Sequence, residues 1–263
     1  MPRVVKAMLH TWEEPCISGT GGAGAIFFSG CSLRCVFCQN NDISCRQTGH
    51  PADMQFLRDM MLDLVRQGAE TIDLVNPTHL TRRLGEVLEG FDPGVPIVYN
   101  TGGYDSLEGL ERMNGKISVY LPDLKYINEE TAAACSDATD YPAVAKAALR
   151  RMAEQVGGCS FSDRGIMTRG MIIRHLILPN RSKEACEILD WILGELPDWV
   201  YVSLMRQYVP YGRALSIPSL NRRITSFEYN RVVDYALSLD MDRVFIQGKG
   251  AADTRFIPDF SVP

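Results

Sequence analysis

The residues best suited to chemistry are three cysteines in one short run, Cys31, Cys35 and Cys38. Thiolates are soft ligands that favour zinc, copper(I) or iron–sulfur clusters. A ferredoxin-like [4Fe–4S] site needs four cysteines. The remaining cysteines are scattered, and none of them forms a C-x-x-C pair: Cys16, Cys45, Cys135, Cys159 and Cys186. The spacing therefore predicts a cluster in which one iron lacks a protein thiolate, and an open coordination position is where chemistry can occur.

A zinc site is the alternative interpretation of this run, with Cys45 or a histidine as the fourth ligand. However, the spacing C-x-x-x-C-x-x-C differs from that of zinc ribbons, in which two close pairs are separated along the chain. Phe37 directly precedes the third cysteine. An aromatic ring there would either cover a cluster and line a nucleoside pocket or simply pack in the core.

Composition narrows the class of protein. A chain of 263 residues with 46% hydrophobic and 22% charged residues is typical of one soluble globular domain. The net charge of -5, without a basic block, argues against a nucleic-acid partner. No apolar stretch is long enough to span a membrane. The first residues lack the apolar region of a secretory signal, so we expect a reducing cytoplasm, where clustered cysteines bind metals.

Short apolar runs alternate with amphipathic stretches along the chain. The runs predicted as strands are 25–29, 71–75, 96–99, 117–121, 171–178, 200–205 and 244–247. The stretches predicted as helices are roughly 53–68, 79–88, 106–113, 141–156, 182–196 and 225–239. This alternation predicts an α/β fold with a parallel sheet, a single-domain partial (β/α)6 TIM-like barrel. Residues 25–247 would form the barrel core, 1–24 a lead-in and 248–263 a tail.

In such a barrel the active site lies at the C-terminal ends of the strands. The polar residues expected there are Cys31, Asn76, Asn100, Asp123, Asn180 and Gln207. Arg174 lies inside an apolar strand and needs a partner for its charge. His175 points to the opposite face of that strand, so we expect it to pack against a helix. Residues 157–169 form either a surface loop or a lid.

The motif C-x-x-x-C-x-aromatic-C after a first strand resembles the hallmark of the radical S-adenosylmethionine (SAM) superfamily. Within it, the chain is similar to pyruvate formate-lyase activating enzymes and, more closely, to their uncharacterised homologues of the PflX type. The runs that carry the resemblance are 10–15, 26–31, 38–40, 74–79, 99–104, 120–126, 174–179 and 203–208.

The resemblance implies a radical SAM barrel and its mechanism. Cys31, Cys35 and Cys38 would hold three irons of a [4Fe–4S] cluster, and SAM would chelate the fourth. One electron would cleave SAM to methionine and a 5′-deoxyadenosyl radical, which abstracts hydrogen from the substrate. The expected electron donor is a flavodoxin or ferredoxin-like protein. The substrate would be a glycyl-radical enzyme or a small molecule or peptide; a non-catalytic iron–sulfur or zinc protein is the remaining alternative.

The resemblance also implies contacts to the cofactor. The family's Gly-Gly-Glu motif is replaced here by residues 76–79, where backbone carbonyls and the Thr78 hydroxyl would substitute, unless Asn76 simply starts a turn. Asn100 and Asp123 match activase positions that hold a monovalent cation, although Asn100 is neutral. The residues expected to contact SAM are Phe37, Asn76, Thr78, Asn100, Thr101, Asp123, Lys125, Arg174 and Gln207.

Overall fold

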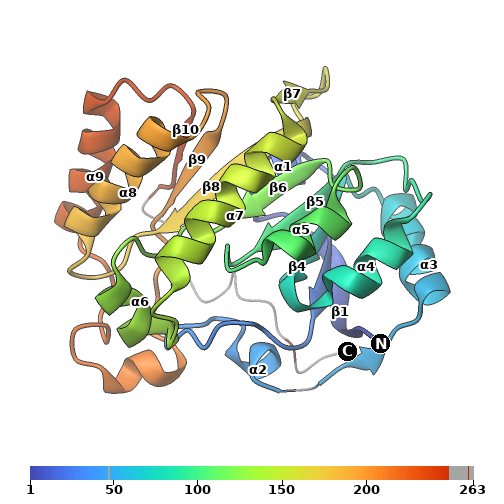
Figure 1. Ribbon diagram of the computed structural model, residues 1–263, viewed down its shortest axis with the longest axis horizontal. Coiled ribbons are helices and arrows are strands. Elements are labelled where there is room, and N and C mark those ends of the chain that lie inside the picture. The colour runs from blue at the N-terminus through green and yellow to red at the C-terminus, as the bar shows by residue number, and fades with distance from the viewer. Residues whose placement is uncertain (47, 249–259, 261–263) are drawn as a thin grey trace.

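The computed structural model describes residues 1–46, 48–248 and 260 (Figure 1). Its strands are β1 Arg3–His10, β2 Ala23–Phe28, β3 His50–Pro51, β4 Thr71–Val75, β5 Ile97–Thr101, β6 Val119–Pro122, β7 Ser160–Phe161, β8 Met167–Leu176, β9 Tyr201–Met205 and β10 Val244–Ile246. Its helices are α1 Pro15–Ser18, α2 Asn41–Ser44, α3 Met54–Arg66, α4 Thr81–Leu88, α5 Leu107–Met113, α6 Glu129–Ser136, α7 Tyr141–Val156, α8 Ser182–Glu195 and α9 Ser226–Ser238, with 3-10 turns at Thr78–Leu80 and Gly212–Ser216.

The sheet confirms the predicted partial barrel. Its strand order is β10-β9-β8-β6-β5-β4-β2-β1-β3, and β7 pairs only with β8. Every pair from β2 through β10 along this path is parallel. Among the described residues no ladder joins β10 to the opposite edge, so the barrel stays open there. The longer helices cover its outer face (Figure 1).

One strand of the sheet lies within the segment that the sequence predicts only as a lead-in. Arg3–His10 forms β1, which pairs antiparallel with β2 and also with the short β3. Most of its side chains are partly exposed, so its sequence lacks the continuous apolar character of the central strands. Of the predicted tail, only Gly248 and Phe260 lie within the described residues.

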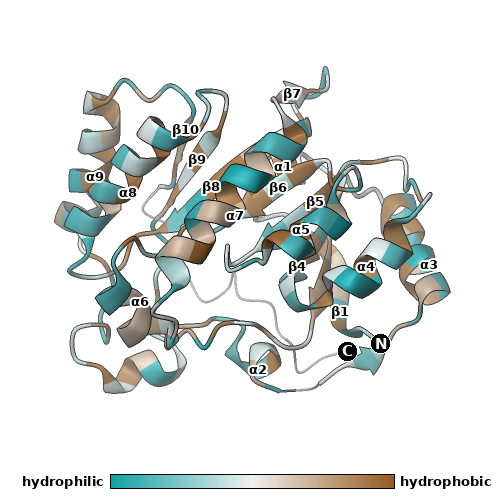
Figure 2. Ribbon diagram, viewed as in Figure 1, coloured by the Kyte–Doolittle hydropathy of each residue, from teal (hydrophilic) through white to brown (hydrophobic). Residues whose placement is uncertain are grey.

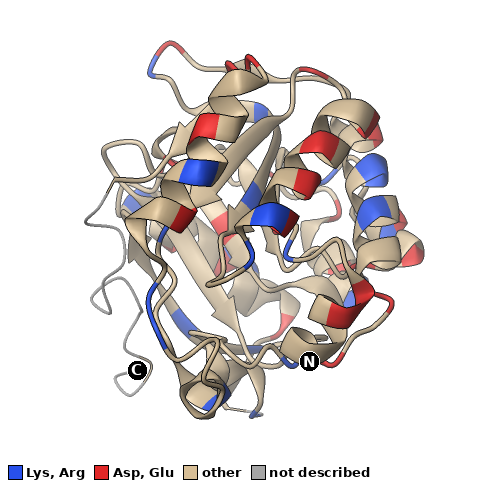
Figure 3. Ribbon diagram, turned by 90° about the vertical axis from the view of Figure 1, so that its left-hand side faces the viewer, with Lys and Arg blue, Asp and Glu red and all other residues tan. Residues whose placement is uncertain are grey.

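The helices form where the sequence supplies both a buried face and a start signal. Asp53 accepts a hydrogen bond from the Phe56 N–H at 2.8 Å and begins α3. Thr225 and Glu228 form the predicted capping box of α9. The helices turn their apolar sides toward the sheet (Figure 2), where most of the core is packed. On their outer faces charges of both signs are interspersed (Figure 3).

The barrel interior has a separate apolar floor. The side chains of Cys16 and Ile17 in α1 pack against Val98, Val119 and Ile172 from three strands. These contacts place α1 inside the barrel near the N-terminal ends of the strands, whereas α2 lies at the opposite end (Figure 1). The pocket described below therefore has a closed inner end.

The stretch 157–169 is a surface hairpin rather than a lid. Ser160 and Phe161 pair with the N-terminal part of β8, and Arg164 forms an ion pair with Glu70, which directly precedes β4. The hairpin thus lies at the end of the sheet opposite α2 (Figure 1). In the described part of the chain no helix is long and apolar enough to cross a bilayer.

Candidate active site

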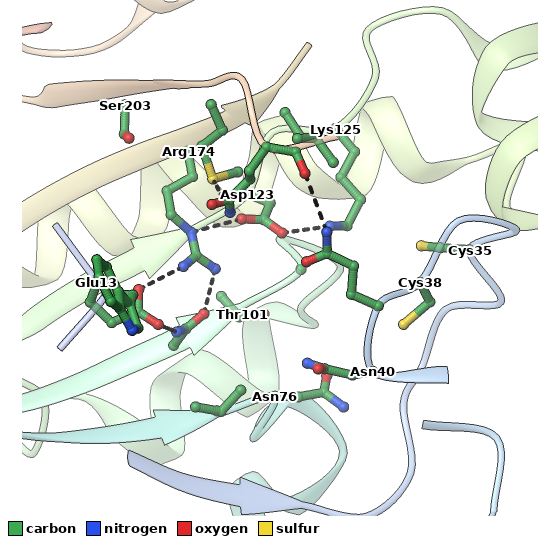
Figure 4. A pocket seen from close by; sticks show the side chains of 18 of the residues that line it. Glu13, Cys35, Cys38, Asn40, Asn76, Thr101, Asp123, Lys125, Arg174 and Ser203 are labelled. Atoms are coloured by element: carbon green, nitrogen blue, oxygen red, sulfur yellow. Dashed lines mark hydrogen bonds and ion pairs between the residues drawn. The ribbon is translucent and has the colours of Figure 1, made fainter. Parts of the chain in front are cut away.

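A cavity of about 500 Å³ occupies the barrel interior (Figure 4). Its lining runs from the loop that carries the three cysteines, past the C-terminal ends of the strands, to the residues that precede α1. We call the part formed by Cys31, Cys35 and Cys38 the thiol end. We call the part formed around Glu13, Glu14 and Asp73 the carboxylate end. This size and mixture of apolar and polar walls suit a nucleoside-sized ligand.

The thiol end begins with a sharp turn after β2. Gly30 has a φ of 92°, and a Cβ there would lie 3.0 Å from His79 Nε2, so a larger residue is disfavoured. His79 Nε2 contacts the Ser29 carbonyl at 2.8 Å. The Asn76 side-chain amide donates to the Gly30 carbonyl. These two side chains, both beyond β4, fix the direction in which the loop leaves β2.

Each thiol of the loop has a hydrogen-bonding neighbour. The Leu33 N–H donates to Cys31 Sγ at 3.4 Å. The Ser136 hydroxyl, at the end of α6, donates to Cys35 Sγ at 3.0 Å. Cys38 Sγ lies 3.6 Å from the Ser44 hydroxyl. Such contacts orient thiolates and adjust the reduction potential of a cluster bound to them.

The donor set suits an iron–sulfur cluster, because thiolates are soft ligands. All three cysteines are free thiols that line the cavity, and Figure 4 shows Cys35 and Cys38 side by side. In the described ranges no three His, Cys, Asp or Glu side chains are close enough to share one metal ion. Burial raises the pKa of the Cys38 thiol to about 11, so metal binding there must release a proton.

Arg174 joins three elements at the centre of the cavity wall (Figure 4). Its Nε donates to Asp123 Oδ1 at 3.0 Å, and its Nη1 donates to Glu13 Oε2 at 3.0 Å. Its Nη2 donates to Asn100 Oδ1 at 2.6 Å. Asn100 in turn donates to Asp73 Oδ2 at 3.1 Å. The sequence predicts that Arg174, a charged residue in an apolar strand, has partners for its charge. They come from β5, from the residue after β6 and from the segment before α1.

The charges around Arg174 shift one another's ionisation. Burial alone would raise the pKa of Asp123, but the Lys125 ammonium and the Arg174 guanidinium lower it. Burial likewise raises the pKa of Glu13 and Glu14, against the opposing charge of Arg174. Burial raises the pKa of Asp73 well above its ordinary range, and the charge of Glu13 adds to this. Asp123 is therefore held as a carboxylate, whereas the other three gain affinity for protons.

The cavity brings together most of the predicted cofactor contacts. Phe37, Asn76, Asn100, Thr101, Asp123, Lys125, Arg174 and Gln207 all line it. Phe37 is nearly buried and forms an edge-to-face contact with Tyr208, with ring centres 5.8 Å apart. Gln207 accepts a hydrogen bond on its backbone carbonyl from Gln39, in the cysteine loop, at 3.3 Å.

Several predicted residues are engaged differently from the expectation. Thr78 lies outside this cavity, and its hydroxyl is 2.8 Å from that of Thr101. Thr101 donates to the buried Asp105 at 2.6 Å, so its hydroxyl serves an internal network. Asn180 also lies outside the cavity, where its N–H donates to Glu228 at 2.7 Å.

The oxygens matched to a monovalent-cation site already have partners. Asn100 Oδ1 and Asp123 Oδ1 accept hydrogen bonds from Arg174. The other Asp123 oxygen pairs with Lys125. The Arg174 guanidinium thus supplies a positive charge to the two side chains expected to bind that cation.

His175 faces away from the cavity, as predicted from its place on β8. Its Nδ1 lies 2.7 Å from the Leu124 carbonyl, so it bonds to the backbone after β6. Glu13, Glu14, Asp73 and Ser136 have no assigned role in the sequence interpretation. The signal that singled out Arg174, a charged residue inside an apolar strand, also applies to Asp73 in the run TIDLV.

Comparison with known proteins agrees with this geometry. A protein-family profile described as a 4Fe-4S single cluster domain matches residues 17–90, which include all three cysteines. The uncharacterized protein MJ0674 of Methanocaldococcus jannaschii is 29% identical over 246 residues, covering 90% of this chain and 68% of that protein.

Superposition on solved structures identifies the fold. SuiB of Streptococcus suis bound to S-adenosylmethionine superposes with a TM-score of 0.54 at 11% identity, over 83% of this chain and 48% of SuiB. Methylornithine synthase (PylB) superposes with a TM-score of 0.54 at 14% identity, over 85% of this chain and 70% of PylB. The chain has the fold of the radical SAM enzymes. It spans about half the length of SuiB, and these low identities carry the fold rather than a reaction.

Proposed function

We propose that this chain is a radical SAM enzyme. The observation that carries the proposal is the placement of three free thiols at one end of a nucleoside-sized cavity in a radical SAM barrel. A [4Fe–4S] cluster on Cys31, Cys35 and Cys38 would supply one electron to the sulfonium of SAM, so that the carbon–sulfur bond breaks into methionine and a 5′-deoxyadenosyl radical that abstracts a substrate hydrogen.

The chain's own residues would bind and orient the cofactor. Three thiols would hold three irons and leave one for the amino and carboxylate groups of SAM. Lys125 lies in the cavity wall with its ammonium paired to Asp123, where it can turn toward a carboxylate or ribose. Phe37 and Gln207 border the space where an adenine ring would lie. Burial within the barrel excludes water from a reactive radical.

The first test is anaerobic turnover. The protein would be reconstituted with iron and sulfide, reduced, mixed with SAM and assayed for 5′-deoxyadenosine by liquid chromatography. We expect the product from the wild type and none from Cys35→Ala. An intact [4Fe–4S] spectrum together with measurable SAM binding but no product would count against the proposed reaction.

As the substrate we propose the one implied by the resemblance to activases, a glycine in a partner protein that becomes a glycyl radical. A flavodoxin or ferredoxin-like protein would supply the electron. The test is to mix the reduced enzyme and SAM with a glycyl-radical enzyme encoded near this chain and to record the radical by electron paramagnetic resonance. Absence of the signal, with 5′-deoxyadenosine still formed, would redirect the search to small molecules or peptides.

A further inference from the structure

The carboxylate end of the cavity carries more negative than positive charge. Four carboxylates surround the centre of the barrel, those of Glu13, Glu14, Asp73 and Asp123. Among the described residues, Arg174 and Lys125 form ion pairs with these carboxylates. His10 also lines the cavity, and burial together with the charge of Arg174 lowers its pKa. Full ionisation would therefore leave an excess of two negative charges in a buried region.

Two carboxylate oxygens at this end have no partner in the described part of the chain. They are Glu14 Oε2 and Asp73 Oδ1. Glu14 is 7% exposed and lines the cavity, whereas Asp73 is fully buried behind it. Burying an unsatisfied carboxylate oxygen is costly, because the group has lost its water without gaining a donor. Glu14 lines the cavity, so a small turn of its side chain would present the orphaned oxygen to a ligand that donates hydrogen bonds.

The lining around Glu14 suits an organic cation. No three acidic, histidine or cysteine side chains among the described residues are arranged to coordinate one ion. Leu176, Met205 and Phe245 line the same cavity and present apolar surface. A ligand with a charged nitrogen on a hydrocarbon chain would satisfy both surfaces.

We propose that the inner end of the cavity binds the positively charged nitrogen group of the substrate, an ammonium or a guanidinium, through the Glu14 carboxylate. This inference rests on the proposed function, since the ligand would be the molecule that loses hydrogen. Ser203 lines the same cavity, and its side chain lowers the pKa of Glu14 against the effect of burial. Arg174 donates to Glu13 Oε2 at 3.0 Å, whereas no donor among the described residues reaches Glu14 Oε2.

The test measures binding of n-butylammonium to the reconstituted full chain, by saturation-transfer nuclear magnetic resonance at constant ionic strength. We expect Glu14→Gln to raise the dissociation constant about tenfold or more, because a charge-assisted hydrogen bond is lost. Glu14→Asp should restore part of the affinity, which separates loss of charge from misfolding. Glu108→Gln, on the exposed face of α5, is the matched control and should leave binding unchanged. n-Butanol, which has no charge, should bind equally to all variants.

Two further probes identify the source of the cation. Nα-acetyl-lysine methylamide would bind more tightly than n-butylammonium when the natural ligand is a peptide side chain, and less tightly when it is a free amine; either result supports the proposal. Competition by potassium or magnesium ions that displaces n-butylammonium at equal concentration would overturn it in favour of a metal ion.

The remaining outcomes separate this inference from the proposed function. Equal binding of n-butylammonium to the wild type and Glu14→Gln, or no binding at all, overturns the inference even when 5′-deoxyadenosine is formed. Weakening of SAM binding by Glu14→Gln, with n-butylammonium excluded by SAM, also overturns it, because the cofactor's own sulfonium would then fill the site. Glu14-dependent binding without any SAM cleavage would retain the cation site and reject the radical reaction.

Discussion

The thiol end and the carboxylate end of the cavity are built in opposite ways. The thiol end is a loop whose sulfur atoms receive hydrogen bonds from uncharged groups, among them Ser136 from α6. The carboxylate end is carried by strands and by the segment before α1, and it is held by the ion pairs of Arg174. The difference indicates that the cavity separates two tasks, since one end is suited to a redox group and the other to charge.

The largest expected effect is at the thiol end. Cys35→Ala should abolish cluster assembly and 5′-deoxyadenosine formation, because the remaining two thiols cannot hold three irons. The measurements are iron and sulfide content and the visible absorption of the reconstituted protein. Cys186→Ala, in the outer helix α8, is the matched control and should keep the full cluster. Loss of the cluster in that control would show that the ligand set is wrong.

Removing Arg174 should have the next largest effect, at the boundary between the two ends. Arg174→Met leaves Glu13 and Asp123 without their buried partner, so we expect a loss of about 3–5 kcal/mol in unfolding free energy. Urea denaturation of the metal-free protein measures it. Arg150→Met, which breaks an exposed ion pair with Glu195, should cost less than about 1 kcal/mol. Equal losses in the two variants would mean that the Arg174 pairs do not hold the barrel together.

The orphaned carboxylates predict an unusual pH dependence. Burial raises the pKa of Glu14 and Asp73 above 4.5 and 3.8. The folded chain therefore holds protons that the unfolded chain releases, and wild-type stability falls as the pH rises through the raised folded values. The double variant Glu14→Gln/Asp73→Asn cannot lose these protons. We expect its unfolding free energy relative to the wild type to grow with pH, by on the order of 1–3 kcal/mol at the alkaline end.

Comparison of the double variant with the wild type isolates the contribution of Glu14 and Asp73 to the pH dependence. Burial lowers the pKa of His10, His79 and His175, so both chains should lose stability as the pH falls through 6.5. This loss cancels in the difference between the chains. Urea denaturation at several pH values from 5 to 8.5 (about one unit apart) would measure it. A difference that is constant across this range would show that Glu14 and Asp73 titrate normally.

The smallest expected effect concerns a single hydrogen bond at the thiol end. Ser136→Ala removes the donor to Cys35 Sγ, and such donors stabilise the more negative, reduced cluster. We expect a lower reduction potential, corresponding to about 1 kcal/mol. A potentiometric titration followed by electron paramagnetic resonance measures it. Ser238→Ala, at the exposed end of α9, should leave the potential unchanged, and an unchanged value in Ser136→Ala would reduce that serine to a packing role.

The two ends also differ in how far the sequence predicts them. The thiol end lies in one run of the chain, so residue type and spacing were enough to locate it. Arg174 was predictable as well, because a guanidinium within an apolar strand requires a partner. Asp73 offers the same signal, yet its position matters only through Asn100 and Glu13, which the fold brings from other segments. Contacts such as Ser136 to Cys35 join residues 101 positions apart, and no local pattern encodes them.

The strand pattern was predicted well where strands are buried on both faces, but β1, next to the short edge strand β3, was missed. β1 is half-exposed and contains Arg3 and Lys6, so its hydrophobic periodicity is weak. Thr78 and Thr101 illustrate a different limit. Both were expected to contact the cofactor. Thr101 lines the cavity, but its hydroxyl donates to Asp105 and lies 2.8 Å from the hydroxyl of Thr78, which lies outside the cavity. A family motif places a residue, whereas its local hydrogen-bond partners decide where it points.

The apolar floor formed by α1 has a consequence for the order of folding. Ile17 is fully buried, but its partners extend as far along the chain as Ile172 in β8. During synthesis this apolar segment therefore exists long before the strands that enclose it, and contacts of such sequence separation form slowly. We expect the barrel floor to be the last part to become protected, so that α1 is the segment a chaperone or protease meets in an incomplete chain.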